Sequence, residues 1–199
     1  MTELKISTLP KSHDIYLNGD ITESSVGDFV ERLNGIVDED NTLIADNLNT
    51  IRLCGFDAVE PERPEINIHL NTYGGSVYDG LSAYDAIMRV RERYSVSIYC
   101  SGKVMSAGTF ILQAGTKRIA SPNTLFMVHD ISTVERGKLK DIQNSLAHTV
   151  RLRDMINKIY TERTYLTEIQ LNEIYNTQKD LYFNAKEALD VYGLIDMII

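Results

Sequence analysis

Three side chains in this sequence are of the types that perform nucleophilic hydrolysis: a serine, a histidine and an aspartate. Ser106 lies in a turn of small residues between a predicted strand, 96–100, and an apolar helical segment that begins at Thr109. A serine nucleophile needs a base within hydrogen-bond reach and a third group that orients the base. His129 follows the apolar run 125–128 and is the one histidine at a predicted strand end next to that turn. Taken singly, Ser106 is better interpreted as a helix N-cap and His129 as a structural histidine, and it is their combination with the other strand ends that favours chemistry.

Asp180 is the candidate for the third group, although taken singly it would be a solvated loop carboxylate. The chain order Ser106, His129, Asp180 differs from the orders found in trypsin-like, subtilisin-like and α/β-hydrolase enzymes. Residues 104–108 read Val-Met-Ser-Ala-Gly, so the G-x-S-x-G elbow is also missing from the sequence. These two observations exclude those three classes of serine hydrolase.

A pair of glycines, Gly74 and Gly75, could bind a ligand oxygen through the backbone. The alternating pattern of 66–70 predicts a strand before them, and a helical stripe from Val77 predicts a helix after them, with Ser76 as its cap. Free N–H groups at such a turn form oxyanion or phosphate nests, whereas the alternative is a turn that only needs positive φ. The sequence contains neither G-x-G-x-x-G nor G-x-x-x-x-G-K, so phosphate is the weaker interpretation.

Predicted strands and helices alternate along the chain, which favours an α/β fold with a parallel sheet. The strand patterns fall at 14–19, 66–70, 96–100, 117–120 and 125–128. Chemistry in such sheets gathers beyond the carboxyl ends of the strands. Gly75, Ser106 and His129 each follow a predicted strand at that end, so we expect the three to converge.

Residues 138–163 carry apolar residues at helical spacing and predict one long helix that projects and packs against another subunit. Two capping boxes, at 167–170 and 184–187, predict two shorter helices, the second of which runs to Tyr192 with Gly193 just beyond its end.

The chain divides into a short polar leader, residues 1–13, and one domain, residues 14–199. Within the domain, residues 46–65 mix Asn, Asp, Glu and Pro with isolated apolar residues and predict a long surface loop or insertion. Residues 42–45 fit either a strand or a continuation of the helix predicted over 24–36.

Composition excludes several kinds of partner. The 199 residues are 43% hydrophobic and 24% charged, ordinary values for a soluble globular protein, and the net charge is -8. That charge argues against nucleic acid and anionic membranes as partners. No apolar run could span a membrane, and the first residues lack the apolar stretch of a signal peptide. Cys54 and Cys100 have no metal-type spacing. We therefore expect a cytoplasmic protein without a metal site.

Four blocks, taken in order, carry a resemblance to a known family. They are Asn-Thr-Tyr-Gly-Gly-Ser-Val at 71–77, Gly-Lys-Val-Met-Ser-Ala-Gly at 102–108, Phe-Met-Val-His at 126–129, and Asp-Leu-Tyr-Phe-Asn-Ala-Lys-Glu-Ala at 180–188 with Tyr-Gly-Leu-Ile-Asp at 192–196. In this order the blocks resemble the proteolytic subunit of the Clp protease family, including its phage-encoded members. The resemblance covers roughly residues 14–199.

The resemblance implies a serine endopeptidase that hydrolyses unfolded proteins or peptides through an acyl-enzyme. Ser106 would be the nucleophile, His129 the general base and Asp180 the carboxylate that orients His129. The backbone N–H groups of Gly75 and Ala107 would form the oxyanion hole. The peptidase subunit would need no cofactor, and ATP would be used by a separate chaperone ring that delivers substrate.

The resemblance also implies a crotonase-like spiral fold of ββα units with a long handle, residues 132–163. The helix 138–163 would join two stacked heptameric rings, and residues 132–138 would bind substrate in extended form. Gly102 and Gly108 are interpreted as clearance for a substrate backbone.

Three positions depart from the family pattern: Tyr73 replaces a proline, Ala107 a methionine and Lys179 an arginine linked to ring contacts. Lysine cannot form the planar bidentate pair that arginine forms. The sequence therefore supports the double ring less strongly than it supports the fold. Two alternatives stay open: a catalytically silent assembly subunit, and a crotonase-type acyl-CoA enzyme that would not need the three triad positions together. A Ser–Lys peptidase is disfavoured because it would normally carry a membrane anchor.

Overall fold

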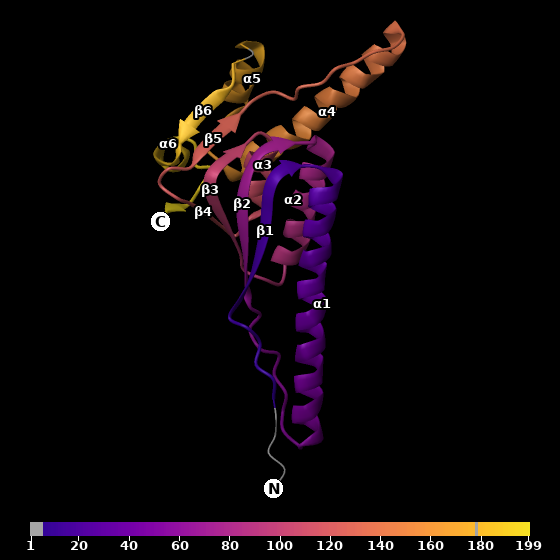
Figure 1. The fold of residues 1–199 in the computed structure, drawn as a ribbon, viewed down its shortest axis with the longest axis vertical. Coiled ribbons are helices and arrows are strands. Elements are labelled where there is room, and N and C mark those ends of the chain that lie inside the picture. The colour runs from indigo at the N-terminus through magenta and orange to yellow at the C-terminus, as the bar shows by residue number, and fades with distance from the viewer. Residues whose placement is uncertain (1–5, 178) are drawn as a thin grey trace.

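One mostly parallel sheet forms the centre of the computed structural model, which describes residues 6–177 and 179–199 (Figure 1). The described residues form seven strands: β1 (Ser12–Ile21), β2 (Glu65–Gly75), β3 (Val96–Met105), β4 (Lys117–Ala120), β5 (Leu125–Val128), β6 (Leu181–Asn184) and β7 (Met197–Ile198). Strands β1, β2, β3, β4 and β7 lie in that order and pair in parallel. The end of β3 pairs instead with β5, and β5 pairs antiparallel with β6. The parallel sheet expected from the sequence is confirmed, whereas the antiparallel strand β6 was not predicted.

Helices cover one face of this sheet. The described helices are α1 (Glu23–Leu53), α2 (Val77–Arg91), α3 (Ala107–Ile111) with a 3-10 turn (Leu112–Ala114), α4 (Leu139–Arg163), α5 (Glu168–Thr177) and α6 (Ala185–Asp190). Figure 1 shows α1 and α2 side by side against β1 and β2. On β2 every second residue is buried toward these helices, among them Ile66, Ile68 and Leu70. This alternation is the period of a strand with one face in the core.

Helix α1 is much longer than the sequence predicted, because the interpretation of residues 46–65 as a loop is wrong for 46–53. The buried Ile44 is followed by the half-buried Leu48 and Ile51, so the helical apolar spacing continues through the polar stretch. The helix ends where Gly55 adopts a φ of 81°. Residues 42–45 are therefore helical, and the connection to β2 is confined to residues 54–64. The C-terminal part of α1 extends beyond the sheet (Figure 1).

The leader is shorter than predicted, because β1 already begins at Ser12. Its residues 1–5 lie outside the described part of the chain. The Ser7 N–H donates to the Asn47 side chain, and the Asn47 side chain donates to the Ser7 carbonyl. The leader thus packs against the extension of α1.

The long helix predicted over 138–163 is confirmed as α4. Its N-terminal half projects from the body of the protein (Figure 1) and exposes four apolar side chains, Leu139, Ile142, Leu146 and Val150. Its C-terminal half packs into the core through Leu152, Ile156, Ile159 and Tyr160. In the described part of the chain, no helix is both long and apolar enough to cross a membrane.

Both predicted capping boxes are present. Thr167 and Gln170 exchange side-chain and backbone hydrogen bonds before α5, and Asn184 and Glu187 do so at α6. Helix α6 ends at Asp190, two residues earlier than expected, and Gly193 turns the chain with a φ of 60°.

Candidate active site

Ser106 occupies the single residue between β3 and α3 and has an unusual backbone. Its φ is 51° and its ψ is -120°, and among the described residues it is the one non-glycine with positive φ. Such a conformation costs of the order of 1–3 kcal/mol and persists only where the surroundings enforce it. The Ser106 side chain makes no helix-cap hydrogen bond. Ser106 therefore occupies the N-cap position of α3 without capping the helix through its side chain, and its hydroxyl is free for another partner.

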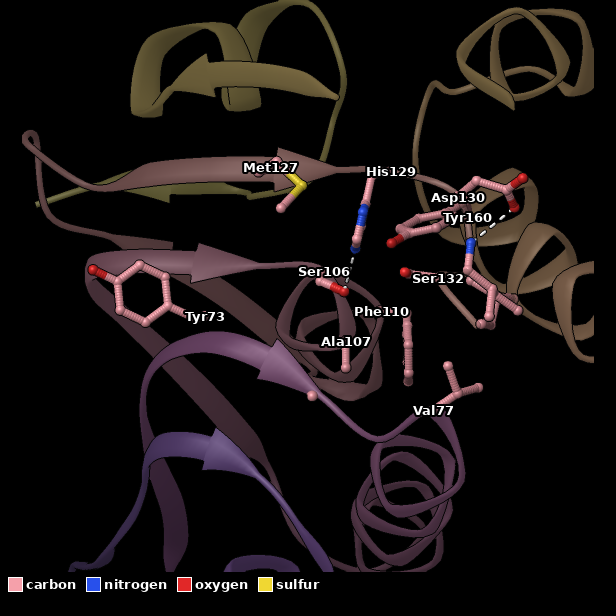
Figure 2. Close-up of a pocket in the computed structure, with 13 residues that line it drawn as sticks. Tyr73, Val77, Ser106, Ala107, Phe110, Met127, His129, Asp130, Ser132 and Tyr160 are labelled. Carbon is pink, nitrogen blue, oxygen red and sulfur yellow. Dashed lines mark hydrogen bonds between the residues drawn. The ribbon is translucent and has the colours of Figure 1, made fainter. Parts of the chain in front are cut away.

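That partner is His129. Strand β5 pairs with the end of β3, with Met105 opposite Met127, and the Ser106 N–H donates to the Met127 carbonyl at 2.8 Å. Because of this register, His129, the residue after β5, lies next to Ser106, the residue after β3. The distance from His129 Nε2 to Ser106 Oγ is 2.7 Å, within hydrogen-bond range (Figure 2). The predicted convergence of the two strand ends is thus observed.

Asp180 approaches the other nitrogen of the same ring, but less closely. Because Val128 of β5 lies opposite Leu181 of β6 in an antiparallel pair, the residues just beyond them, His129 and Asp180, face each other. His129 Nδ1 and Asp180 Oδ1 are 3.8 Å apart, which is an ion-pair distance and too long for a hydrogen bond. The Asp180 side chain is 45% exposed. The structure therefore brings all three residues together, but only Ser106 lies within hydrogen-bond distance of His129.

The glycine turn at the end of β2 packs directly against Ser106. Gly74 has a φ of 99°, and a Cβ there would lie 2.6 Å from the Ser106 Cβ. Gly75 has a φ of 149°, and a Cβ there would lie 2.2 Å from the Ile21 carbonyl oxygen of β1. Only glycine satisfies both the positive φ and the close approach. Ser76 accepts a hydrogen bond from the N–H of Asp79 and caps α2, as expected.

Gly108 does not provide the clearance for substrate that the sequence suggested. A Cβ on Gly108 would lie 2.5 Å from the Thr72 side chain of β2, so the space beside it is filled by that strand. Its role is the close packing of α3 against β2. Gly102 differs, because a Cβ there would only touch the Asn71 side chain at 3.4 Å, and its φ of 65° is what favours glycine.

Comparison with known proteins identifies the family. The family model described as Clp protease matches residues 36–199. A curated protein named "ATP-dependent Clp protease proteolytic subunit", from Deinococcus radiodurans, is 37% identical over 150 residues, which are 74% of this chain and 71% of that protein. The chain belongs to the Clp protease family. It is a Clp-type serine peptidase, and its α/β fold with a long handle helix agrees with the fold expected from the resemblance.

A cavity of about 280 Å³ opens beside Ser106 and His129 in this Clp-type fold. Apolar side chains form much of its wall, and they come from three helices and a strand: Val77, Phe110, Met127, Ile156 and Tyr160 (Figure 2). Gly75 and Ala107 also line it. The cavity can hold an apolar side chain next to the Ser106 hydroxyl. Within the described residues, no cluster of three or more potential metal ligands is found.

Two residues next to the site escaped the sequence analysis: Thr109 and Tyr160. Tyr160 appears in the sequence as one apolar-stripe position of a long helix, and Thr109 as part of an apolar helix start. The distance between their hydroxyl oxygens is 2.6 Å, and both residues are buried. Burial raises the pKa of the Tyr160 hydroxyl above its usual range, so it remains a proton donor. No sequence spacing relates the two residues, which are 51 positions apart.

Tyr73, which stands in place of the family proline, takes part in a local surface contact. The Lys103 ammonium lies 4.1 Å from the centre of the Tyr73 ring and 3.4 Å from the Asn71 side-chain oxygen. This cation–π contact fastens the end of β2 to β3. The substitution therefore leaves the glycine turn that follows it in place.

Proposed function

We propose that this Clp-type peptidase is an endopeptidase that cleaves peptide bonds of unfolded polypeptides through an acyl-enzyme on Ser106. The observation that carries the proposal is the 2.7 Å contact between Ser106 Oγ and His129 Nε2 at the edge of an apolar cavity. A histidine in that position can take the serine proton as general base.

The first half of the reaction moves one proton from Ser106 to His129 and on to the leaving nitrogen, forms a bond from Ser106 Oγ to the carbonyl carbon and breaks the peptide C–N bond. Ser106 Oγ attacks the carbonyl carbon of the scissile peptide while its proton moves to His129 Nε2. The His129 imidazolium then protonates the leaving amine, which departs and leaves an ester on Ser106. In the second half, His129 takes a proton from water and the hydroxide attacks the ester carbon. The bond from that carbon to Ser106 Oγ then breaks, the carboxylic acid product leaves, and His129 returns the proton to Ser106 Oγ. Asp180, acting on His129 Nδ1, would hold the ring and stabilise its charged form.

The negative charge on the substrate oxygen needs hydrogen-bond donors, for which we propose the N–H groups of Gly75 and Ala107. The Ser76 N–H donates to Ile21 of β1 at 2.8 Å. Successive amides of a strand point to opposite edges, so the Gly75 N–H is directed away from β1. The Ala107 N–H, first in its helix, has no intrahelical acceptor. Both residues line the cavity beside Ser106. Removing one such donor costs about 10²–10³-fold in rate in serine peptidases.

Covalent labelling tests the proposal. A fluorophosphonate probe should label the wild-type protein and fail to label Ser106→Ala, and a fluorogenic peptide should be hydrolysed only by the wild type. His129→Ala should lose labelling, whereas His69→Ala should keep it, because His69 contacts Asp14 on the open face of the sheet. No labelling of the assembled wild-type protein would favour the silent assembly subunit. Hydrolysis of an acyl-CoA thioester that survives Ser106→Ala would favour the crotonase-type alternative.

We further propose that the subunit works as a homo-oligomer of two stacked heptameric rings in the cytoplasm, supplied with polypeptides by an ATPase chaperone ring. The support is the projecting half of α4, whose four exposed apolar side chains resemble an interface rather than a solvated surface. Residues 132–138 lead into this helix without helix or strand, as a segment that pairs with extended substrate would. The peptidase subunit itself would use no cofactor. A native mass of fourteen subunits is expected, and a monomer would overturn the assembly.

A further inference from the structure

The carbonyl oxygen of Ser106 is held by the side chain of Thr109. It accepts a hydrogen bond from the Thr109 N–H at 2.9 Å and another from Thr109 Oγ1 at 2.6 Å. A threonine hydroxyl has one proton to donate, and here a carbonyl takes it. The 2.6 Å contact between Thr109 Oγ1 and Tyr160 Oη must therefore be donated by Tyr160. The result is a directed chain from the Tyr160 hydroxyl through Thr109 to the Ser106 carbonyl.

This chain ends on the peptide group that matters for the oxyanion. The Ser106 carbonyl and the Ala107 N–H belong to the same planar unit, so fixing the oxygen also fixes the direction of the N–H. Hydrogen bonds accepted by a carbonyl polarise its peptide and strengthen the N–H as a donor, by about 10–30% per bond. The same peptide follows a residue at a φ of 51°, which needs external support to persist.

The chain also has a fixed origin, because Tyr160 lies on the handle helix. Tyr160 is 3% exposed and Thr109 is fully buried, so water does not compete for either hydroxyl. Figure 2 shows the Tyr160 side chain directed from α4 toward the Ser106 turn. The contact connects the packed half of α4 to the peptide after the nucleophile.

We propose that Tyr160 and Thr109 are positioning residues that orient and polarise the Ser106–Ala107 peptide as an oxyanion donor. The proposal rests on the function proposed above. The rate of acylation would then depend on the position of the handle helix α4. The two hydroxyl groups, rather than general packing, would carry this dependence.

The pair is tested by removing single hydroxyl groups from the full-length, assembled protein. Tyr160→Phe keeps the ring in the cavity wall and removes the donor at the origin of the chain, and Thr109→Val removes the link. The measurements are kcat and KM for a fluorogenic peptide, and the inhibition constant of a peptide boronate whose tetrahedral adduct places an oxygen in the oxyanion hole. Loss of a whole donor costs about 10²–10³-fold. We expect a weakened donor to cost about tenfold in Thr109→Val and about threefold in Tyr160→Phe.

Three features of the result would separate positioning from a merely structural role. The loss should fall on kcat with KM nearly unchanged, and the boronate should weaken by the same factor. The double variant should be no slower than Thr109→Val alone, because both changes break one chain. Thr109→Ser retains the hydroxyl, so its kcat should be close to the wild-type value and above that of Thr109→Val.

Tyr175→Phe is the matched control, because Tyr175 is also buried and donates its hydroxyl to Asn157 on the same helix α4. Its unfolding temperature should fall as much as that of Tyr160→Phe while kcat stays at the wild-type value. Equal kinetics of the two phenylalanine variants in a labelled, active enzyme would overturn this inference and leave the proposed function intact. A wild-type protein that the fluorophosphonate does not label would overturn both.

Discussion

The two contacts that His129 makes within the candidate site are held very differently. On one side, Ser106 is fixed by β3, by the Met127 carbonyl and by the glycine turn of β2, and its hydroxyl lies 2.7 Å from His129. On the other side, Asp180 immediately precedes β6, its side chain is 45% exposed, and its Oδ1 lies 3.8 Å from His129 Nδ1. Ser106 is positioned by the parallel strands β2, β3 and β5, whereas Asp180 is positioned by the antiparallel strand β6.

This difference indicates where activity can be regulated. A group packed among buried strands cannot shift without disturbing the core, whereas an exposed carboxylate can close or open a gap of about 1 Å at small cost. We infer that the Ser106 side is complete in one subunit and that the Asp180 side responds to what contacts β6 and the residues before it. In the ring assembly proposed above, contacts between subunits are the natural source of such an effect.

The largest effect should come from the well-held side. His129→Ala removes the base while leaving Ser106 in place, and loss of a triad serine or histidine typically costs about 10⁶-fold in kcat. We expect hydrolysis of a fluorogenic peptide to fall to the background seen with Ser106→Ala. Appreciable turnover by His129→Ala would mean that another group deprotonates the serine.

A smaller effect is expected on the loosely held side. Asp180→Asn should slow the reaction by about 10²–10⁴-fold, less than loss of the histidine, because triad carboxylates contribute less than the other two members. The deficit should be greater in the assembled particle than in dissociated subunits, where Asp180 already lies too far away to help. An equal deficit in both states would show that assembly does not bring Asp180 closer to His129.

A third prediction concerns the glycine turn at Gly74, where a substitution should change the packing around Ser106 without removing a reactive group. In Gly74→Ala the new methyl group would lie 2.6 Å from the Ser106 Cβ, so the turn or the serine must move. We expect a loss of about 1–3 kcal/mol in unfolding free energy, as for other overpacked sites, and slower labelling of Ser106. Gly27→Ala is the control, since a Cβ there meets nothing within 4 Å and a helical alanine should stabilise α1. Urea unfolding and the rate of probe incorporation measure the two effects.

The smallest predicted effect concerns acid stability of the framework behind Ser106. Arg118 forms hydrogen bonds with Asp196 and with Gln113, in the turn after α3. Burial alone would raise the pKa of Asp196, but the hydrogen bonds and charge of Arg118 outweigh it, so the pKa lies below the ordinary 3.8. The ionised Asp196 therefore stabilises the fold above pH 3.8, and that contribution is lost as the pH falls through the lowered pKa.

Comparing the wild type with Asp196→Asn measures this contribution. The variant should unfold at a lower temperature at pH 7, and the difference between the two proteins should shrink below about pH 3.8. A difference that stays constant across this range would show that the Asp196 charge does not support the fold.

Much of the site could be predicted because its residues lie at strand ends, and strand ends are marked by local patterns. The alternation of 66–70 and the apolar run 125–128 place Gly75 and His129 correctly. Asp180 could be assigned only through the family resemblance, because β6 has four residues and its pairing with β5 is not encoded locally. The φ of Ser106 was missed for the same reason: it is imposed by the Met127 carbonyl and by β2, not by the serine itself.

The errors elsewhere also have physical causes. Frequent asparagine and aspartate make residues 46–53 resemble a loop, but one apolar face and contact with the leader suffice to continue α1. Gly108 suggested room for substrate, whereas the sequence alone could not reveal that Thr72 fills that room. Close packing between strands is a tertiary property.

The most direct test of the central claim is to map where a fluorophosphonate attaches in the assembled wild-type protein. Peptide mass analysis should find a single adduct on Ser106, absent from His129→Ala and retained in His69→Ala. An adduct on any other residue, or none on a folded and assembled protein, would contradict the assignment of Ser106 as the nucleophile.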